Sequence, residues 1–305
     1  MPTDTFLSLL ADPSVQTVSL GAGGLGAVTG AVGTFAVVRR QSLVGDAVSH
    51  AALPGVAVAF LLGMREPALL AIGAGVAGWV AMATVGGIVR RTRVPFDTAL
   101  AGALAVFFGF GILLMTYIKK HVPGAANHGL ERYLFGQAAI MRADDLWAIA
   151  GFGGFAVLVL ALYWKELKAV AFDPDFAASL GLPARRLDLL LTTLVVVGVV
   201  VGLQAVGVVL MSALVVAPAV AARQWSDRLG RVTLLAAAFG ASAGVAGTLL
   251  SHALSDRGRP VPTGPTIVLC ATAFVVVSLL VAPRRGVLWN WRTRAIAAPP
   301  EVAAG

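Results

Sequence analysis

Charged residues and cysteine are both scarce in this sequence of 305 residues. Only 12% of the residues are Asp, Glu, Lys or Arg, whereas 58% are hydrophobic, and the mean hydropathy is +0.87. This composition excludes an ordinary soluble globular domain. The single cysteine, Cys270, excludes an intramolecular disulfide. Because it lies in an apolar run, it also gives no indication of the redox compartment.

Two sequence features that are common in other classes of protein are missing. No Lys or Arg precedes Arg39, so the N-terminus lacks the basic region of a cleavable signal peptide, and we expect the first apolar segment to remain as an anchor. No Gly-Lys dipeptide occurs, which excludes a phosphate-binding loop. We therefore expect a chain that is not itself an enzyme, with any ATP hydrolysis on another subunit.

Long apolar segments dominate what is present. Segments of about 20 residues, the length that crosses a membrane as a helix, can be placed at 17–38, 43–63, 67–89, 97–118, 146–164, 187–203, 206–222, 231–254 and 263–282. The prediction is an all-α polytopic membrane protein with about nine transmembrane helices, eight and ten being the alternatives.

The sixth and seventh segments come from one continuous apolar run, 187–222. As a single helix this run would measure about 54 Å, far more than the roughly 30 Å of a hydrocarbon core. Gly202, Gln204 and Gly207 lie near its middle. We therefore expect a hairpin or a re-entrant break near 203–207.

The distribution of basic residues predicts the orientation. With nine crossings and an outer N-terminus, 16 of the 23 Lys and Arg residues lie in inner segments. The net charge of +8 is thus explained by a positive inner side and does not indicate a nucleic-acid partner. We expect a multi-pass protein of the cytoplasmic membrane, with residues 1–286 as one transmembrane domain and 287–305 as a disordered cytoplasmic tail.

Ionisable residues near the start of the second segment are the main candidate site. Asp46 and His50 are four residues apart and share a helical face, although a carboxylate inside a membrane span costs roughly 2.5–3.5 kcal/mol. Pro54 cannot donate to the carbonyl of His50. Gly45 and the neighbouring Ser49 are small enough to admit another helix. The pattern predicts a metal or proton site on a pathway; the alternative is a structural polar pair satisfied by neighbouring helices.

The stretch from Arg39 to Gly55, which reads Arg-Arg-Gln-Ser-Leu-Val-Gly-Asp-Ala-Val-Ser-His-Ala-Ala-Leu-Pro-Gly, resembles the signature of permease subunits of ABC importers for zinc, manganese and iron. The resemblance extends over most of the chain, as far as Pro283. It implies that Asp46 and His50 coordinate the transported metal, and that Arg39, Ser49 and Pro54 belong to the pathway or its gate.

The inner loop 165–188 contains a second candidate segment. Asp173 suits a helix N-cap, Pro174 the first helical position and Asp175 the positive helix end, while Gly181 suits the helix end. An apolar stripe repeats at helical spacing, formed by Phe172, Phe176 and Leu180. Such a stripe could rest on lipid headgroups or fit a groove on a partner. The segment resembles the coupling segment that docks into the cytoplasmic ATPase in the same permease family.

Several isolated residues carry weaker signals. In the outer loop 119–145, Leu130–Gly136 reads as a short interfacial helix, which could be a docking surface or an ordinary connector. Four further side chains are of types that can bind a metal, but the sequence assigns them no role: His121, His128, Met211 and His252. His121 and His128 have no acidic residue or cysteine at ligand spacing, and a lone Met in an apolar helix usually packs.

The resulting prediction is the permease subunit of an ATP-driven importer for a divalent zinc, manganese or iron ion. The implied partners are two cytoplasmic ATPases, which bind the ATP, an extracytoplasmic metal-binding protein and a second permease subunit, identical or related. No permanently bound cofactor is expected. Two copies would supply two carboxylates and two imidazoles, a plausible coordination set for these metals. The alternative is a stand-alone secondary transporter in which Asp46 and His50 relay protons.

Overall fold

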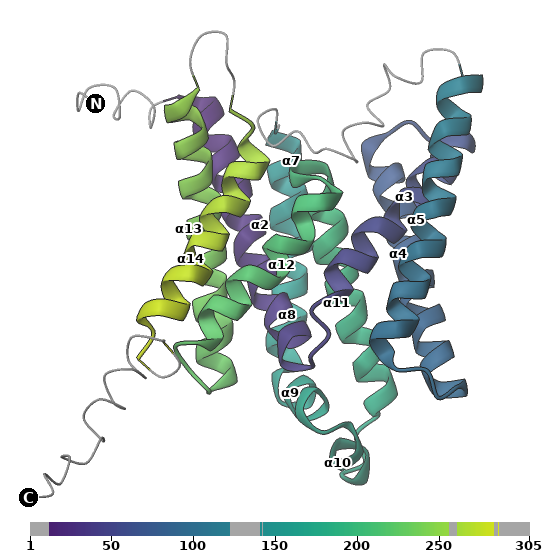
Figure 1. Cartoon of the computed structure of the whole chain (residues 1–305), viewed down its shortest axis with the longest axis vertical. Helices are drawn as coiled ribbons and strands as arrows, with labels where there is room; N and C mark the ends of the chain where they lie inside the picture. The colour runs from purple at the N-terminus through teal and green to yellow at the C-terminus, as the bar shows by residue number, and fades with distance from the viewer. Residues whose placement is uncertain (1–11, 123–140, 142, 256–260, 284–285, 287–305) are drawn as a thin grey trace, which may run out of the picture.

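The computed structural model describes residues 12–122, 141, 143–255, 261–283 and 286 (Figure 1). Regular structure in these residues is entirely helical. Eight helical segments are long and apolar enough to cross a membrane: α2 (Pro13–Val38), α3 (Val44–Leu61), α4 (Pro67–Arg91), α5 (Phe96–His121), Asp144–Leu162, Ala184–Leu203 of α11 (Ala184–Val206), α13 (Leu229–Leu254) and α14 (Thr263–Val281). The expected all-α polytopic membrane protein is confirmed.

The ninth segment, α12 (Val208–Arg223), is apolar but short. Its 16 residues span about 24 Å, less than a typical hydrocarbon core. Gly207 separates it from α11 with φ +87°, a conformation that glycine adopts without steric cost. The break expected near 203–207 is therefore present, and the reversal of the chain there is made by a single glycine.

The fifth membrane segment contains an irregularity that periodicity did not predict. A π-helical turn, η3 (Ile149–Gly153), interrupts the span between α7 (Ala143–Ala148) and α8 (Gly154–Leu162). Ile149 and Gly153 are buried there, and a Cβ atom at Gly153 would lie 2.7 Å from a methyl carbon of Val28 on α2. The π turn thus lies where this segment packs closely on α2.

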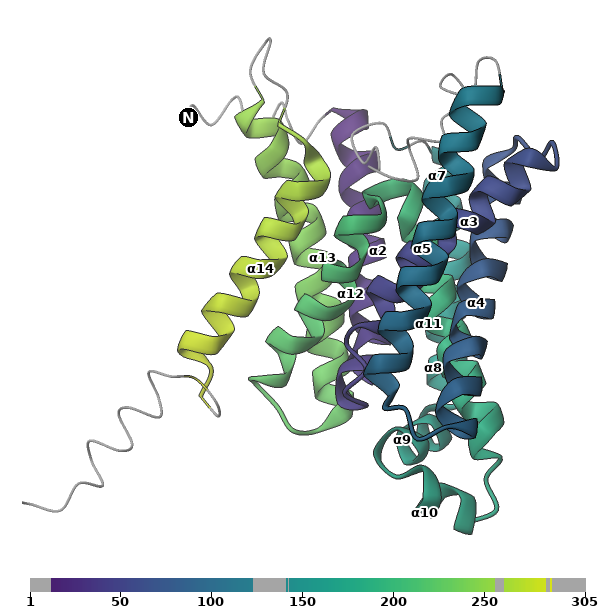
Figure 2. The same ribbon diagram turned by 45° about the vertical axis from the view of Figure 1, so that its right-hand side comes forward.

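Helix α2 occupies the middle of the bundle because its small residues admit close neighbours. α13 and α14 lie on one side of it, and α3, α4 and α5 lie on the other (Figures 1 and 2). A Cβ atom at Gly26 would come within 2.1 Å of the Gly240 carbonyl oxygen on α13, and one at Gly240 within 2.0 Å of the Gly26 oxygen. Such backbone contact through small residues is the usual way in which helices associate in lipid.

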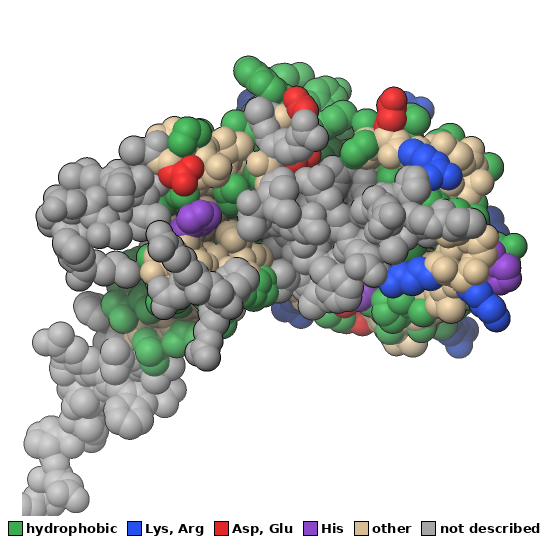
Figure 3. Space-filling model, turned by 90° about the horizontal axis from the view of Figure 1, so that it is seen from above, with side chains coloured by type: hydrophobic (Ala, Val, Ile, Leu, Met, Phe, Trp, Pro, Cys, Tyr) green, Lys and Arg blue, Asp and Glu red, His purple; other side chains and the backbone are tan. Residues whose placement is uncertain are grey.

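One end of the bundle carries two short helices, α9 (Trp164–Phe172) and α10 (Pro174–Ser179), which lie beyond the membrane-spanning helices (Figure 1). The 39–43 turn between α2 and α3 lies at the same end. The opposite end shows acidic and basic side chains scattered around its rim (Figure 3). The predicted interfacial helix Leu130–Gly136, with His128, and the predicted tail 287–305 lie outside the described residues.

Candidate functional site

Asp46 and His50 lie side by side on the first turns of α3, as their spacing predicts. The Nε2 atom of His50 is 3.4 Å from a carboxylate oxygen of Asp46. The Asp46 side chain is 36% exposed and that of His50 is 19% exposed. A carboxylate and an imidazole therefore meet in a place that is neither sealed in the core nor fully open.

The surroundings of His50 leave part of its hydrogen-bonding capacity unused. The ring meets Phe108 of α5 edge to face, with the centroids 4.7 Å apart. Its Nδ1 atom is buried and has no hydrogen-bond partner among the described residues. A buried polar atom without a partner costs free energy. The hydrogen-bonding capacity of His50 is therefore only partly used within the described structure.

Gly45, next to Asp46, lets the neighbouring helix α12 approach the pair closely. A Cβ atom at Gly45 would touch Val215 and the backbone of Ser212 on α12 at 3.4 and 3.7 Å. The Ser212 side chain is in turn a hydrogen-bonding partner of Asp46. The α12 segment that follows the Gly207 break thus borders the carboxylate. Sequence reasoning had not connected these two parts of the chain.

Ser49 and Pro54, both predicted on the pathway, are buried. The Ser49 hydroxyl donates to the Gly45 carbonyl oxygen at 2.7 Å, within its own helix. Pro54 lies inside α3, which continues through it to Leu61. The structure therefore places Asp46 and His50 together at the accessible surface of α3, with Ser49 and Pro54 behind them in the packing. Their roles in a pathway stay predictions.

The described part of the chain holds no further ligand group at this point. Among those residues, no cluster of three or more His, Cys, Asp or Glu side chains is close enough to hold a metal ion. Asp46 and His50 offer one carboxylate and one imidazole, fewer than the four or more ligands that divalent transition metals usually take. A metal bound here would need ligands in addition to these two side chains.

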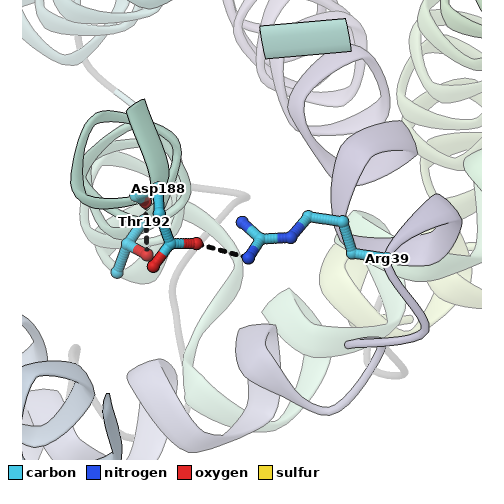
Figure 4. A network of polar contacts seen from close by, with 3 residues as sticks. All are labelled: Arg39, Asp188 and Thr192. Carbon is cyan, nitrogen blue, oxygen red and sulfur yellow. Dashed lines mark hydrogen bonds and ion pairs between the residues drawn. The ribbon is translucent and has the colours of Figure 1, made fainter. Parts of the chain in front are cut away.

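Arg39, the third predicted gate residue, caps the C-terminus of α2 and forms an ion pair with Asp188 of α11 (Figure 4). The Arg39 side chain is 14% exposed and that of Asp188 is 38% exposed. Thr192, one turn further along α11, donates its hydroxyl to the backbone oxygen of Asp188 at 2.9 Å. Asp188 was not among the predicted site residues. An acidic residue at the edge of an apolar segment was the signal that could have marked it.

The coupling segment has the local structure that its residues predict. The Asp173 side chain caps α10 by accepting from the Phe176 N–H at 2.9 Å, and Pro174 is the first residue of α10. Gly181 closes the helix with φ +78°. The three apolar residues of the stripe are each more than half exposed: Phe172, Phe176 and Leu180. An apolar surface at the end of the molecule is therefore present, as expected for a docking segment.

Of the four unassigned residues, three lie in the described part. The Nδ1 atom of His121 is 3.0 Å from the Tyr117 carbonyl oxygen, and its ring stacks on Tyr117. Met211 is fully buried and packs against Gly202. His252 lies in the last turn of α13. His121 and Met211 thus have local structural partners.

Most of the chain resembles known transport proteins. Residues 11–282 match the model of the ABC 3 transport family. The chain belongs to the ABC 3 transport family. The resemblance that the 39–55 and 172–181 stretches indicated is therefore confirmed, and with it a membrane component of an ABC transporter.

Two membrane proteins of metal transport systems are similar to this chain over most of its length. It is 45% identical over 292 residues to the zinc transport system membrane protein TroC of Treponema pallidum, covering 95% of this chain and 96% of that protein. It is 41% identical over 278 residues to the manganese transport system membrane protein MntC of Bacillus subtilis. That alignment covers 91% of this chain and 63% of the Bacillus protein.

The fold also matches an experimental structure. A chain of PsaBC from Streptococcus pneumoniae, solved in complex with a Fab, superimposes with a TM-score of 0.80 at 30% identity. The match covers 96% of this chain and 100% of that chain. The arrangement of helices in this chain is thus one that an experimental structure also shows.

Proposed function

We propose that this protein is the membrane-spanning permease of an ATP-binding-cassette importer for a divalent transition metal ion: zinc, manganese or iron. Family membership supports the transporter class, and the relatives named for zinc and manganese support the substrate class. The observation that carries the proposal is the Asp46–His50 pair, partly exposed on α3 with the His50 Nδ1 atom unpartnered in the described structure. A carboxylate with an imidazole suits these metals better than calcium or magnesium, which prefer oxygen ligands alone.

The metal site is completed, on this proposal, by a second permease subunit, identical or closely related. One chain offers one carboxylate and one imidazole, and two chains related by a two-fold axis offer two of each. The exposed fraction of Asp46 leaves it accessible to such a partner.

The remaining partners follow from the transporter class. Two cytoplasmic ATPases bind ATP and contact the exposed stripe of Phe172, Phe176 and Leu180, and an extracytoplasmic protein delivers the metal. The permease itself catalyses no reaction. Residues 1–286 act as one permease domain in the cytoplasmic membrane, with the N-terminus outside and the α9–α10 end in the cytoplasm. The excess of basic residues at that end supports this orientation.

Reconstitution distinguishes this proposal from a stand-alone transporter. The permease is placed in liposomes with and without its ATPase, and uptake of zinc, manganese and iron is measured with ATP or with a proton gradient. We expect uptake only when both the ATPase and ATP are present. Uptake by the permease alone on a proton gradient would show that Asp46 and His50 serve a secondary transporter instead.

A further inference from the structure

The ion pair between Arg39 and Asp188 connects α11, the helix that follows the coupling helix α10, with the end of α2, the helix that precedes α3. We propose that Asp188 is a positioning residue that transmits movement of the α10 coupling helix, through Arg39, to the start of α3 and its Asp46–His50 pair. The inference rests on the proposed function. It assigns the coupling between ATP hydrolysis and metal movement to the Arg39–Asp188 ion pair.

On the α10 side, the chain between the coupling helix and Asp188 is short and tied by hydrogen bonds. The Gly181 N–H donates to the Ala178 oxygen at 3.0 Å, and the Leu182 N–H donates to the Ala177 oxygen at 3.1 Å. α11 begins at Ala184, and Asp188 is on its second turn. Ala177, a residue of α10 itself, is fully buried. Because this connection is short and hydrogen-bonded, a displacement of α10 should displace Asp188 as well.

On the α3 side, the connection from Arg39 to the metal-site residues is equally tight. Only residues 39–43 separate α2 from α3, and the Gln41 N–H donates to the Ala36 oxygen at 2.8 Å. Arg40 adopts a left-handed conformation, φ 58°, which a non-glycine residue rarely takes and which holds the turn sharp. The Val44 N–H donates to the Gln41 oxygen at 3.1 Å, and Asp46 follows two residues later.

The ion pair connects the α10–α11 segment with the α2–α3 turn. α11 also packs on α2 and α3 through apolar side chains, but the hydrophobic effect between them is non-directional. A guanidinium–carboxylate pair is directional and fixes the register of the two helices. Because Arg39 is largely shielded from water, its attraction to Asp188 is screened less than at an open surface.

The test measures metal uptake and ATP hydrolysis together, using the complete complex in liposomes. Asp188→Asn keeps the shape of the side chain but removes the charge, and we expect uptake to fall about tenfold or more while hydrolysis by the partner continues. Allosteric couplings typically amount to about 5–150-fold. Asp188→Glu keeps the charge and should retain coupled uptake. Arg186→Gln, which removes an exposed charge two residues away, is the matched control and should behave as the wild type.

The charge exchange decides between transmission and simple stabilisation. The double variant Arg39→Asp, Asp188→Arg rebuilds the pair in reverse, and we expect it to recover at least half of the wild-type ratio of metal moved to ATP hydrolysed. Normal coupling in Asp188→Asn would overturn the inference, as would an equal fall of uptake and hydrolysis. Failure of Asp188→Asn to assemble, repaired by the exchange, would show a purely structural contact and overturn it too. An inactive wild-type complex would instead overturn the proposed function.

Discussion

Gly111 of α5 lies directly against Pro54 of α3. A Cβ atom at Gly111 would come within 2.9 Å of the Pro54 Cδ atom and 2.8 Å of the Leu53 Cβ atom. Three residues earlier on α5, Phe108 meets the ring of His50. The contact between a glycine and a proline thus determines how closely α5 approaches the turn of α3 that carries the histidine.

The first prediction concerns this contact. Gly111→Ala should force α5 and α3 apart, since overpacking a closely packed site costs about 1–3 kcal/mol. Thermal unfolding of the purified permease should show a lower Tm, and metal uptake by the complex should fall because Phe108 moves with α5. Gly109→Ala is the control, because a Cβ atom there meets nothing within 4 Å. A Gly111→Ala protein as stable and as active as Gly109→Ala would contradict the packing explanation.

The second prediction concerns orientation. In a Cys270→Ala background, a cysteine at Met64, between α3 and α4, should react with a membrane-impermeant thiol reagent added outside intact cells. A cysteine at Ser179, at the end of α10, should react only after the membrane is opened. Both native side chains are exposed, so burial does not limit either reaction. The reverse labelling pattern would place the coupling segment outside and invert the proposed topology.

Features set by neighbouring residues could be predicted from the sequence. The length of the apolar runs placed the membrane segments, because a hydrocarbon core has a fixed thickness. The Gly207 break followed from the excess length of one run, and the Asp173 cap and the Gly181 helix end followed from local backbone chemistry. The Asp46–His50 pair followed from four-residue spacing on a helix.

Features set by contacts between distant segments could not be predicted in this way. Phe108 and Ser212 come to His50 and Asp46 from other helices, and nothing in their own sequence surroundings marks them. The partner of Arg39 is Asp188, 149 residues later in the chain. The π turn at Ile149–Gly153 belongs to a segment whose apolar pattern also fits a regular helix. Such contacts depend on how the helices pack, which the spacing within one segment does not specify.

The third prediction concerns the exposed stripe at the end of the molecule. Phe176→Asp should weaken binding of the cytoplasmic ATPase by at least about thirtyfold, since the few residues that dominate an interface each contribute about 2 kcal/mol or more. The measurement is the amount of ATPase that co-purifies with the permease from membranes. Ala178→Asp introduces the same charge at another exposed position of α10 and should reduce binding much less. Equal recovery of ATPase with Phe176→Asp and with the wild type would exclude the stripe as the docking surface.

The last prediction concerns the pair on α3. Asp46→Asn keeps the size of the side chain but removes the charge that compensates for dehydration of a dication, and His50→Ala removes the nitrogen ligand that favours transition metals. Changes of residues that only support metal ligands typically reduce metal affinity about 10–100-fold. We therefore expect each of these variants to lower uptake by about 100-fold or more, while expression and ATPase binding stay normal.

A change of ligand should have a different effect from its loss. His50→Asp replaces nitrogen by oxygen and should shift the preference of the complex toward manganese relative to zinc, because carboxylate ligands suit manganese. The measurement is competition between radioactive zinc, manganese and iron for uptake into liposomes that hold the complete complex with ATP. The matched control is His50→Asn, because Asn has the size of Asp but no charge. This variant should transport zinc, manganese and iron poorly. Normal uptake by the Asp46→Asn, His50→Ala double variant would instead make the pair a structural feature of α3, and the metal would then cross the membrane by other ligands.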